Sequence, residues 1–269
     1  MMLTEEEVEP DFLKKAKIFH FGTLSMTHEG VRKATKKALQ AAKEAGVLIS
    51  FDPNLRPPLW NSLESAKEQI HYGLGYCDIL KISDNEIQFL CGRENYDEGI
   101  QWLTSQYPIP LVLLTLGSEG SRAYYQGRRV DCKGFSCETI ETTGAGDTFC
   151  GSVLNYLSEH GIKHLTDENL KEMLTFANAA AALITTRKGA IRSMPEKEEV
   201  NALIQRANIS STAPKPSSTA RSAVLPCSMS VLMLCASAGS EANMAMACRI
   251  GAACLAPSSP FAASSARRF

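Results

Sequence analysis

Short apolar runs alternate with amphipathic segments along the first half of the chain, and this alternation restricts the fold more than any other feature of the sequence. Strands are predicted at residues 18–22, 47–51, 78–82 and 111–115, and helices between them at 28–45, 62–76, 84–90 and 98–106. Nearly continuous apolar runs such as Val47–Phe51 are typical of strands buried on both faces. The order predicts an α/β fold of three layers, in which helices cover both faces of a mainly parallel sheet.

The second part of the chain adds a hairpin and further helices to this pattern. The hairpin is predicted at 121–132 with Gln126 and Gly127 in its turn, and the helices at 145–160, 167–186 and 196–207. Ligands of parallel sheets bind at the carboxyl ends of the strands, so the loops that follow the strands are the first candidates for a site. These loops are residues 52–56, 83–86 and 115–120.

Composition and charge argue against several classes of partner. Lys and Arg number 28 against 29 Asp and Glu, and a net charge of −1 gives no reason to expect nucleic acid or an anionic membrane as a partner. No apolar run reaches the ~18–20 residues of a membrane span, and the acidic segment 1–12 lacks the regions of a signal peptide. The nine cysteines include no CxxC pair, which favours reduced thiols. We therefore expect a cytoplasmic protein that binds small molecules.

The composition changes at about residue 208. Residues 208–269 are rich in alanine and serine, contain four of the nine cysteines and one acidic residue, Glu241, and show no helix or strand periodicity. This composition predicts a disordered extension. Its cysteines and methionines are unusual for a disordered segment and indicate a separate origin, such as a shifted reading frame. We therefore expect a domain at 1–207 and a low-complexity tail at 208–269.

The segment 140–149 combines a polar, glycine-rich loop with the start of an apolar helix. The first backbone amides of a helix have no partner within it, and the helix dipole adds partial positive charge there. Small residues at Gly144, Ala145 and Gly146 would let the oxygens of a phosphate approach these amides. Asp147 follows in the first turn, where it stays ionised and can accept a proton from a hydroxyl group.

A phosphate site beside a base is what phosphoryl transfer to an alcohol requires, because positioning and charge stabilisation supply most of the catalysis. A structural interpretation is also open, in which the glycines form a turn and Asp147 only stabilises the helix start. Two other phosphate loops are excluded. A dinucleotide fingerprint starting at Gly144 needs glycine at the position of Phe149, and a P-loop starting at Gly146 needs lysine at the position of Ser152.

Several short motifs in a fixed order resemble the PfkB family of carbohydrate kinases, which share the ribokinase-like fold, and within it the bacterial fructokinases. The family signature D-T-x-G-A-G-D is similar to residues 141–147, with Glu141 in place of the opening aspartate. By this resemblance Asp147 is the catalytic base, and Gly144, Ala145 and Gly146 form the anion hole for the transferred phosphoryl group. The similar region runs from about residue 10 to 205.

The resemblance also implies which residues bind the ligands. Those expected near the sugar are Asp52, Asn54 and Arg56, and those expected near ATP are Lys81, Ser83, Glu86, Thr115, Gly117, Gly120 and Asn178. Glu86 would organise Mg²⁺ through water, and a monovalent cation such as K⁺ would be held by Glu141, Thr143, Thr186, Gly189 and Ser193. Each motif also has a structural interpretation: the two loops are good turns, and Asn178 is a polar group satisfied inside a packed helix.

The resemblance implies ATP-dependent phosphorylation of a sugar hydroxyl, with fructose to fructose 6-phosphate as the first choice. Ribose and 2-keto-3-deoxygluconate are alternative substrates, because Arg56 also suits the carboxylate of a sugar acid. The family's first strands, its lid and a glycine-rich sugar-binding element have no counterpart here, so we expect an N-terminally truncated, incomplete fold. The alternative to an enzyme is therefore an inactive remnant that at most binds nucleotide. Intact members of the family would form homodimers.

Overall fold

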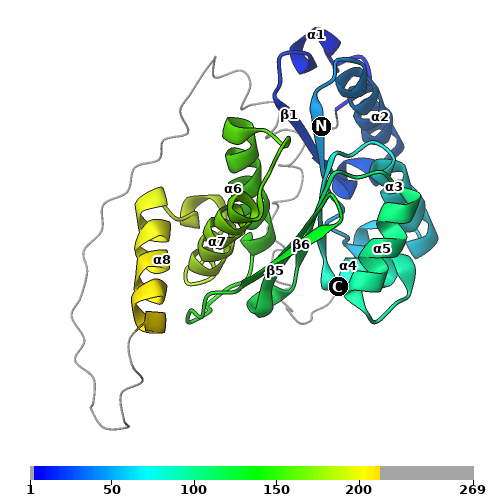
Figure 1. Cartoon of the computed structure of the whole chain (residues 1–269). Helices are drawn as coiled ribbons and strands as arrows, with labels where there is room; N and C mark the ends of the chain where they lie inside the picture. Colours follow the sequence, from blue (N-terminus) through cyan, green and yellow to red (C-terminus); the bar gives the residue numbers. More distant parts are fainter. Residues whose placement is uncertain (1–2, 213–269) are drawn as a thin grey trace, which may run out of the picture.

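The computed structural model describes residues 3–212, and its centre is a six-stranded sheet (Figure 1). The strands follow chain order across the sheet: β1 Ile18–Gly22, β2 Leu48–Asp52, β3 Ile79–Ser83, β4 Leu111–Thr115, β5 Gly120–Tyr125 and β6 Arg128–Lys133. The first four strands are parallel, whereas β5 and β6 form an antiparallel hairpin. The predicted α/β class and mainly parallel sheet are confirmed.

Helices cover both faces of the sheet and complete the three layers (Figure 1). One face carries α1 Pro10–Leu13, α2 Glu29–Glu44, α3 Leu63–Leu74, α4 Asp84–Cys91 and α5 Tyr96–Gln106. The other face carries α6 Ala145–His160 and α7 Asp167–Ile184, and α8 Lys197–Thr212 packs against α7. Short 3₁₀ segments lie at η1 Thr23–Met26, η2 Pro57–Leu59, η3 Gly117–Glu119 and η4 Ile191–Ser193. None of the described helices could cross a membrane.

Two apolar layers hold these elements together, and successive residues of each strand point to opposite layers. Ile49 and Phe51 of β2 belong to the layer beneath α2–α5, whereas Leu111 and Leu113 of β4 belong to the layer beneath α6 and α7. All four side chains are fully buried. A strand with both faces covered has no position for a solvated polar side chain, which explains the continuous apolar runs in the sequence.

The structure shifts some of the predicted boundaries. The strands at 18–22 and 111–115 and the helix at 145–160 lie where the sequence predicts them. The helix expected to end at 207 continues to Thr212, so residues 208–212 of the expected tail are helical. Residues 213–269 lie outside the described part of the chain, and the disorder expected there stays a prediction.

The strand register brings the carboxyl ends of the parallel strands to one edge of the sheet. Gly22 lies beside Asp52, and Ser83 lies beside Thr115. The loops that follow β2, β3 and β4 therefore meet at this edge, as the topology predicted. Among the described strands, β1 has a neighbour on one side only.

Candidate active site

The start of α6 has a backbone that favours glycine at its N-cap and a small residue two positions later. Gly144 is the N-cap, with φ +83°, and a Cβ atom at this position would lie 3.2 Å from Ile184 Cδ1. A Cβ atom at Gly146 would lie 3.4 Å from the Lys81 ammonium. No described side chain caps α6, and the Ala145 amide donates to the Thr142 carbonyl at 3.2 Å, so the amides of Gly146 and Asp147 are the candidates for an anion in the first turn. These features fit the phosphate groups of a nucleotide.

Asp147 lies in the first turn of α6, and its side chain is exposed to solvent. The next residue, Thr148, is buried, and its hydroxyl has no hydrogen-bond partner in the described part of the chain. Together with the open amides, an exposed carboxylate can receive a proton from a bound hydroxyl group. The geometry is compatible with the base that the sequence predicted.

Asp52 and Lys81 form a buried ion pair at the edge of the sheet. The Lys81 ammonium lies 3.1 Å from Asp52 Oδ1 and 3.0 Å from Oδ2, and the two residues are 6% and 4% exposed. Burial opposes the charge on Lys81, but the carboxylates of Asp52 and Glu86 outweigh it, and the pKa of Lys81 is raised. Asp52 was expected near the sugar and Lys81 near ATP. In the structure the two side chains bind one another.

Glu86 connects α4 to the loop that follows β2. One carboxylate oxygen accepts a hydrogen bond from the Leu55 amide at 2.8 Å, and the other accepts from the amide and the hydroxyl of Ser83, both at 2.8 Å. Ser83 is the N-cap of α4 and forms a capping box with Glu86. The expected roles of Ser83 at ATP and of Glu86 at Mg²⁺ stay predictions, because these contacts already give both residues a structural task.

The other two residues expected near the sugar are more accessible. Asn54 adopts φ +43°, a turn conformation that asparagine tolerates, and its amide donates to Asp52 Oδ1 at 3.1 Å. The Arg56 side chain is exposed, and its guanidinium donates to the carbonyl of Leu55 at 3.3 Å. Asn54 and Arg56 can therefore reach a ligand at this edge more easily than the buried Asp52.

The turn after β4 has the backbone that its glycines require. Gly117 and Gly120 have φ values of +55° and +111°, and a Cβ atom at Gly120 would lie 2.1 Å from the Cys132 carbonyl oxygen. Thr115 ends β4 and is half-buried. This turn lies at the same sheet edge as Ser83, as expected for a nucleotide-binding loop.

Asn178 of α7 is buried, and its side chain ties the helix to the hairpin. The amide nitrogen donates to the carbonyls of Cys132 and Lys133, and the amide oxygen accepts from the Ser121 hydroxyl at 2.9 Å. All of its hydrogen-bonding groups thus have protein partners. These contacts give Asn178 a structural role, and its expected position beside adenine stays a prediction.

The residues expected to hold a monovalent cation come from two loops that lie side by side. Thr185 O accepts hydrogen bonds from the amides of Ile140 and Glu141, and Glu141 Oε2 accepts from the Gly189 amide at 3.1 Å. Hydrogen bonds from Thr143 and Gly189 lower the pKa of Glu141. The hydroxyls of the other two residues point to backbone carbonyls, Ser193 to Lys188 and Thr186 to Leu183. The loops meet as expected, and the ion stays a prediction.

Three polar residues near this edge were not identified from the sequence. His20 Nδ1 lies 3.1 Å from the Ser50 hydroxyl on the neighbouring strand, and both residues occupy the sheet face that α6 covers. Cys150 lies one helical turn after Asp147, and burial raises the pKa of its thiol. The sequence could have identified His20 by its position between the buried Phe19 and Phe21, because alternate residues of a strand point to opposite faces of the sheet.

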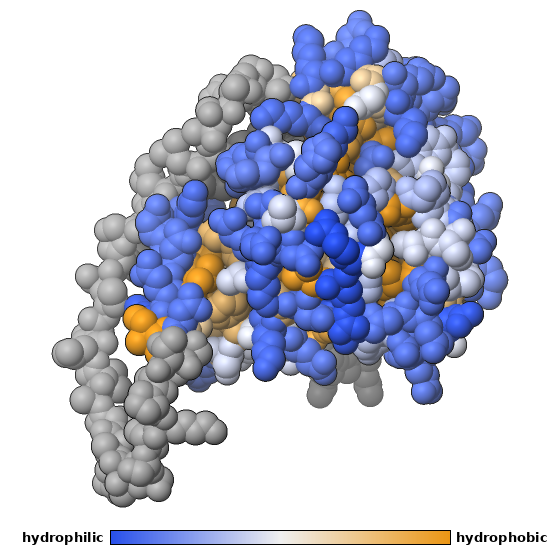
Figure 2. Space-filling view, viewed as in Figure 1, coloured by the Kyte–Doolittle hydropathy of each residue, from blue (hydrophilic) through white to orange (hydrophobic). Residues whose placement is uncertain are grey.

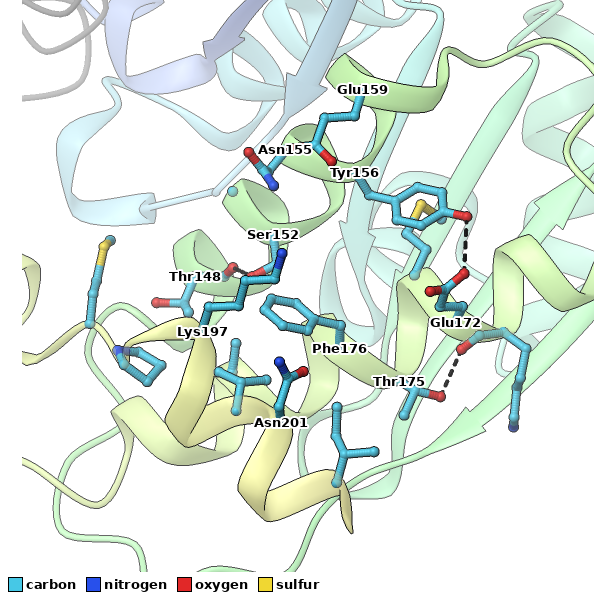
Figure 3. A pocket seen from close by; sticks show the side chains of 18 of the residues that line it. Thr148, Ser152, Asn155, Tyr156, Glu159, Glu172, Thr175, Phe176, Lys197 and Asn201 are labelled. Atoms are coloured by element: carbon cyan, nitrogen blue, oxygen red, sulfur yellow. Dashed lines mark hydrogen bonds between the residues drawn. The ribbon is translucent and has the colours of Figure 1, made fainter. Parts of the chain in front are cut away.

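A separate cavity of about 1640 Å³ runs between α6, α7 and α8 and begins beside Asp147. Figure 2 shows hydrophobic surface between α8 and the neighbouring helices. In Figure 3 the ring of Phe176 lies beside Asn201 of α8, and the end of Lys197 points toward Ser152 of α6. No residue of the loops 52–56, 83–86 or 115–120 lines this cavity. It is therefore distinct from the space above the sheet edge.

Comparisons with known proteins agree with this geometry. Residues 2–197 match the model of the pfkB family of carbohydrate kinases. Fructokinase-2 of Solanum habrochaites is 40% identical over 205 residues, which are 76% of this chain and 62% of that protein. Fructokinase-1 of Zea mays is 38% identical over 207 residues, which are 77% and 64%. The chain thus spans less than two thirds of the length of these relatives.

Solved structures show the same fold. A double-mutant fructokinase from Vibrio cholerae O395, bound to fructose, ADP and potassium ion, is 29% identical with a TM-score of 0.69, over 76% of this chain and 64% of that one. A fructokinase from Xylella fastidiosa with bound ATP is 28% identical with a TM-score of 0.68, over 77% and 66%. The ribokinase-like fold is therefore confirmed, and the chain belongs to the pfkB family of carbohydrate kinases.

Proposed function

We propose that the site at the start of α6 serves ATP-dependent phosphorylation of a sugar hydroxyl, with fructose as the substrate. The observation that carries the proposal is the position of Asp147, one residue beyond a helix start that is open to an anion because of Gly144 and Gly146. The similarity to plant and bacterial fructokinases supports fructose over other sugars.

Each group of residues has a defined task in this proposal. Asp147 accepts the proton of the sugar hydroxyl. At the same time the hydroxyl oxygen attacks the γ-phosphorus of ATP, and the bond between this phosphorus and the leaving ADP breaks. The free amides of the first turn of α6, those of Gly146 and Asp147, bind the oxygens of the transferred group, where negative charge is concentrated. Mg²⁺ would neutralise the nucleotide phosphates, and K⁺ beside Glu141 and Thr143 would stabilise the loop before α6. The turn at Thr115–Gly120 would contact the nucleotide.

A second candidate is nucleotide binding without turnover, and the exposure of the site favours it. Asp147 is exposed to solvent in the described part of the chain. Phosphoryl transfer is efficient only when the hydroxyl is held in line with the phosphate in a site that excludes water.

Two measurements on the purified 269-residue chain separate the candidates. The first is ADP binding with Mg²⁺ by calorimetry, and the second is ATP-dependent phosphorylation of fructose, ribose and 2-keto-3-deoxygluconate with Mg²⁺ and K⁺ present. Turnover of fructose near the ~1–100 s⁻¹ of typical kinases supports the enzyme. Binding without turnover supports the second candidate, and the absence of both rejects the assignment of the site. Preference for 2-keto-3-deoxygluconate would assign Arg56 to a sugar acid.

A further inference from the structure

The buried pair Asp52–Lys81 lies directly behind the start of α6. Among residues 3–212, the Lys81 ammonium and its Cε lie within 4 Å of an ideal Cβ at Gly146, at 3.4 and 3.9 Å, and apart from the helix itself and chain neighbours no other atom does. The Asp52 carboxylate is more than 4 Å from this point, although it contacts the same ammonium at 3.0 Å. The positive end of the pair therefore lies beside Gly146, at the helix start that we assign to the phosphate.

Solvent does not screen the charges of Asp52 and Lys81, because both side chains are buried. Asp52 is 4% exposed, and its carboxylate is held by Lys81 and by the Asn54 amide. In a buried site charges interact more strongly than in water. While Asp52 is ionised, it compensates the ammonium. When Asp52 is neutral, the positive charge behind the helix start is uncompensated.

We propose that Asp52 sets the anion affinity of the α6 start through Lys81: the site binds anions weakly while Asp52 is charged and more tightly when Asp52 is neutral. Lys81 is then a positioning residue, since it acts on a bound phosphate from behind the backbone and not by direct contact. The proposal rests on the proposed function, because it takes the amides of Gly146 and Asp147 as the phosphate site.

The surroundings of Asp52 place this change within reach of physiological pH. Burial raises its pKa to about 6, although Lys81 acts in the opposite direction, and the charges of Glu86 and Asp147 raise it further. The groups that face the pair are Glu86 from α4, Asp147 and Cys150 from α6 and His20 from β1, and Lys81 is the cation among them. A proton on Asp52 thus removes one of several negative charges in the site.

The test measures sulfate binding to the 269-residue chain by calorimetry between pH 5 and pH 8. Sulfate keeps a constant charge over this range, whereas phosphate titrates within it. Wild type should bind sulfate roughly tenfold more tightly at pH 5 than at pH 8. Asp52→Asn should bind at pH 8 as wild type does at pH 5, with no remaining step. Lys81→Met should bind weakly at every pH.

Two variants control for other titrating groups, and one controls for the site. Asp84→Asn removes a half-buried carboxylate near the same edge, and His20→Gln removes a histidine whose pKa burial lowers to about 4. Both should keep the wild-type step. Gly146→Val should abolish sulfate binding at every pH, because its branched side chain would displace the Lys81 ammonium, 3.4 Å from the added Cβ, from the helix start. Circular dichroism of each variant confirms that it folds.

The outcomes distinguish this inference from the proposed function. If Gly146→Val abolishes binding but Asp52→Asn keeps both the affinity and the pH step of wild type, the site stands and the role of Asp52 is rejected. If Gly146→Val binds sulfate as wild type does, the phosphate site itself is elsewhere and both proposals fail. If Lys81→Met fails to fold, Asp52→Asn alone tests the role of Asp52. This variant is expected to fold, because asparagine has the same shape as aspartate.

Discussion

The carboxylate of Glu86 accepts a hydrogen bond from the backbone amide of Leu55 at 2.8 Å, across the edge of the sheet. The same side chain closes the first turn of α4 through Ser83. One residue thus fixes the loop after β2 relative to the loop after β3. The loop that carries Asn54 and Arg56 is therefore held by a side chain that a sequence motif assigns to a metal.

Glu86→Ala should lower the free energy of unfolding by about 2 kcal/mol. The change removes a capping box and leaves the part-buried amides of Leu55 and Ser83 without their acceptor. Urea denaturation of the 269-residue chain measures this difference. The control is Glu68→Ala on the exposed side of α3, which should change stability by less than about 0.5 kcal/mol. Equal effects of the two substitutions would contradict a structural role for Glu86.

Asp147→Asn should reduce the turnover of fructose by about 10²–10⁴-fold, because asparagine cannot accept the proton of the hydroxyl. The affinity for ADP should stay within about twofold of wild type, since the open amides of the α6 start are unchanged. Coupled-enzyme kinetics and calorimetry measure the two quantities on the same preparation. A variant that retained more than a tenth of the rate would show that Asp147 is not the base.

Gly146→Val should weaken ADP binding by roughly tenfold or more. A branched side chain at this position would meet the Lys81 ammonium, which lies 3.4 Å from an ideal Cβ, and would crowd the approach to the amides. Gly151→Val is the matched control on the same helix, because a Cβ there has no atom within 4 Å. Comparable ADP affinity in both variants would mean that the nucleotide phosphates bind elsewhere.

Gly120→Ala should destabilise the fold by about 2 kcal/mol or more. The residue has φ +111°, and an added Cβ would lie 2.1 Å from the backbone oxygen of Cys132, so the hairpin has to move. Gly30→Ala in α2 should instead stabilise the fold. Its Cβ would point into open space, and alanine favours a helix over glycine by about 1 kcal/mol. Thermal unfolding followed by circular dichroism should show shifts of opposite sign, and shifts of the same sign would contradict the geometry of the turn.

The sequence by itself determined the order of strands and helices and the position of the candidate site. Apolar runs such as Leu111–Thr115 and the break at Gly144 act over a few residues, so local propensity is enough to recognise them. The topology of a parallel sheet then placed the loops after β2, β3 and β4 at one edge, and the structure confirms this. The position of Asp147 in the first turn of a helix also followed from local pattern alone.

Only the tertiary structure decided which of the polar residues at this edge remain free for a ligand. Asp52 and Lys81 are 29 positions apart, and Asn178 is 57 positions from its partner Ser121, so neither pairing leaves a signal in the local sequence. Motif matching assigned Asp52, Lys81 and Asn178 to ligands, but strand register and helix packing join Asp52 to Lys81 and Asn178 to Ser121. Burial makes the unpaired alternative costly, since a buried charge or amide without a partner loses its hydration without compensation. The exposed Asp147 has no such constraint, and it is therefore available for chemistry.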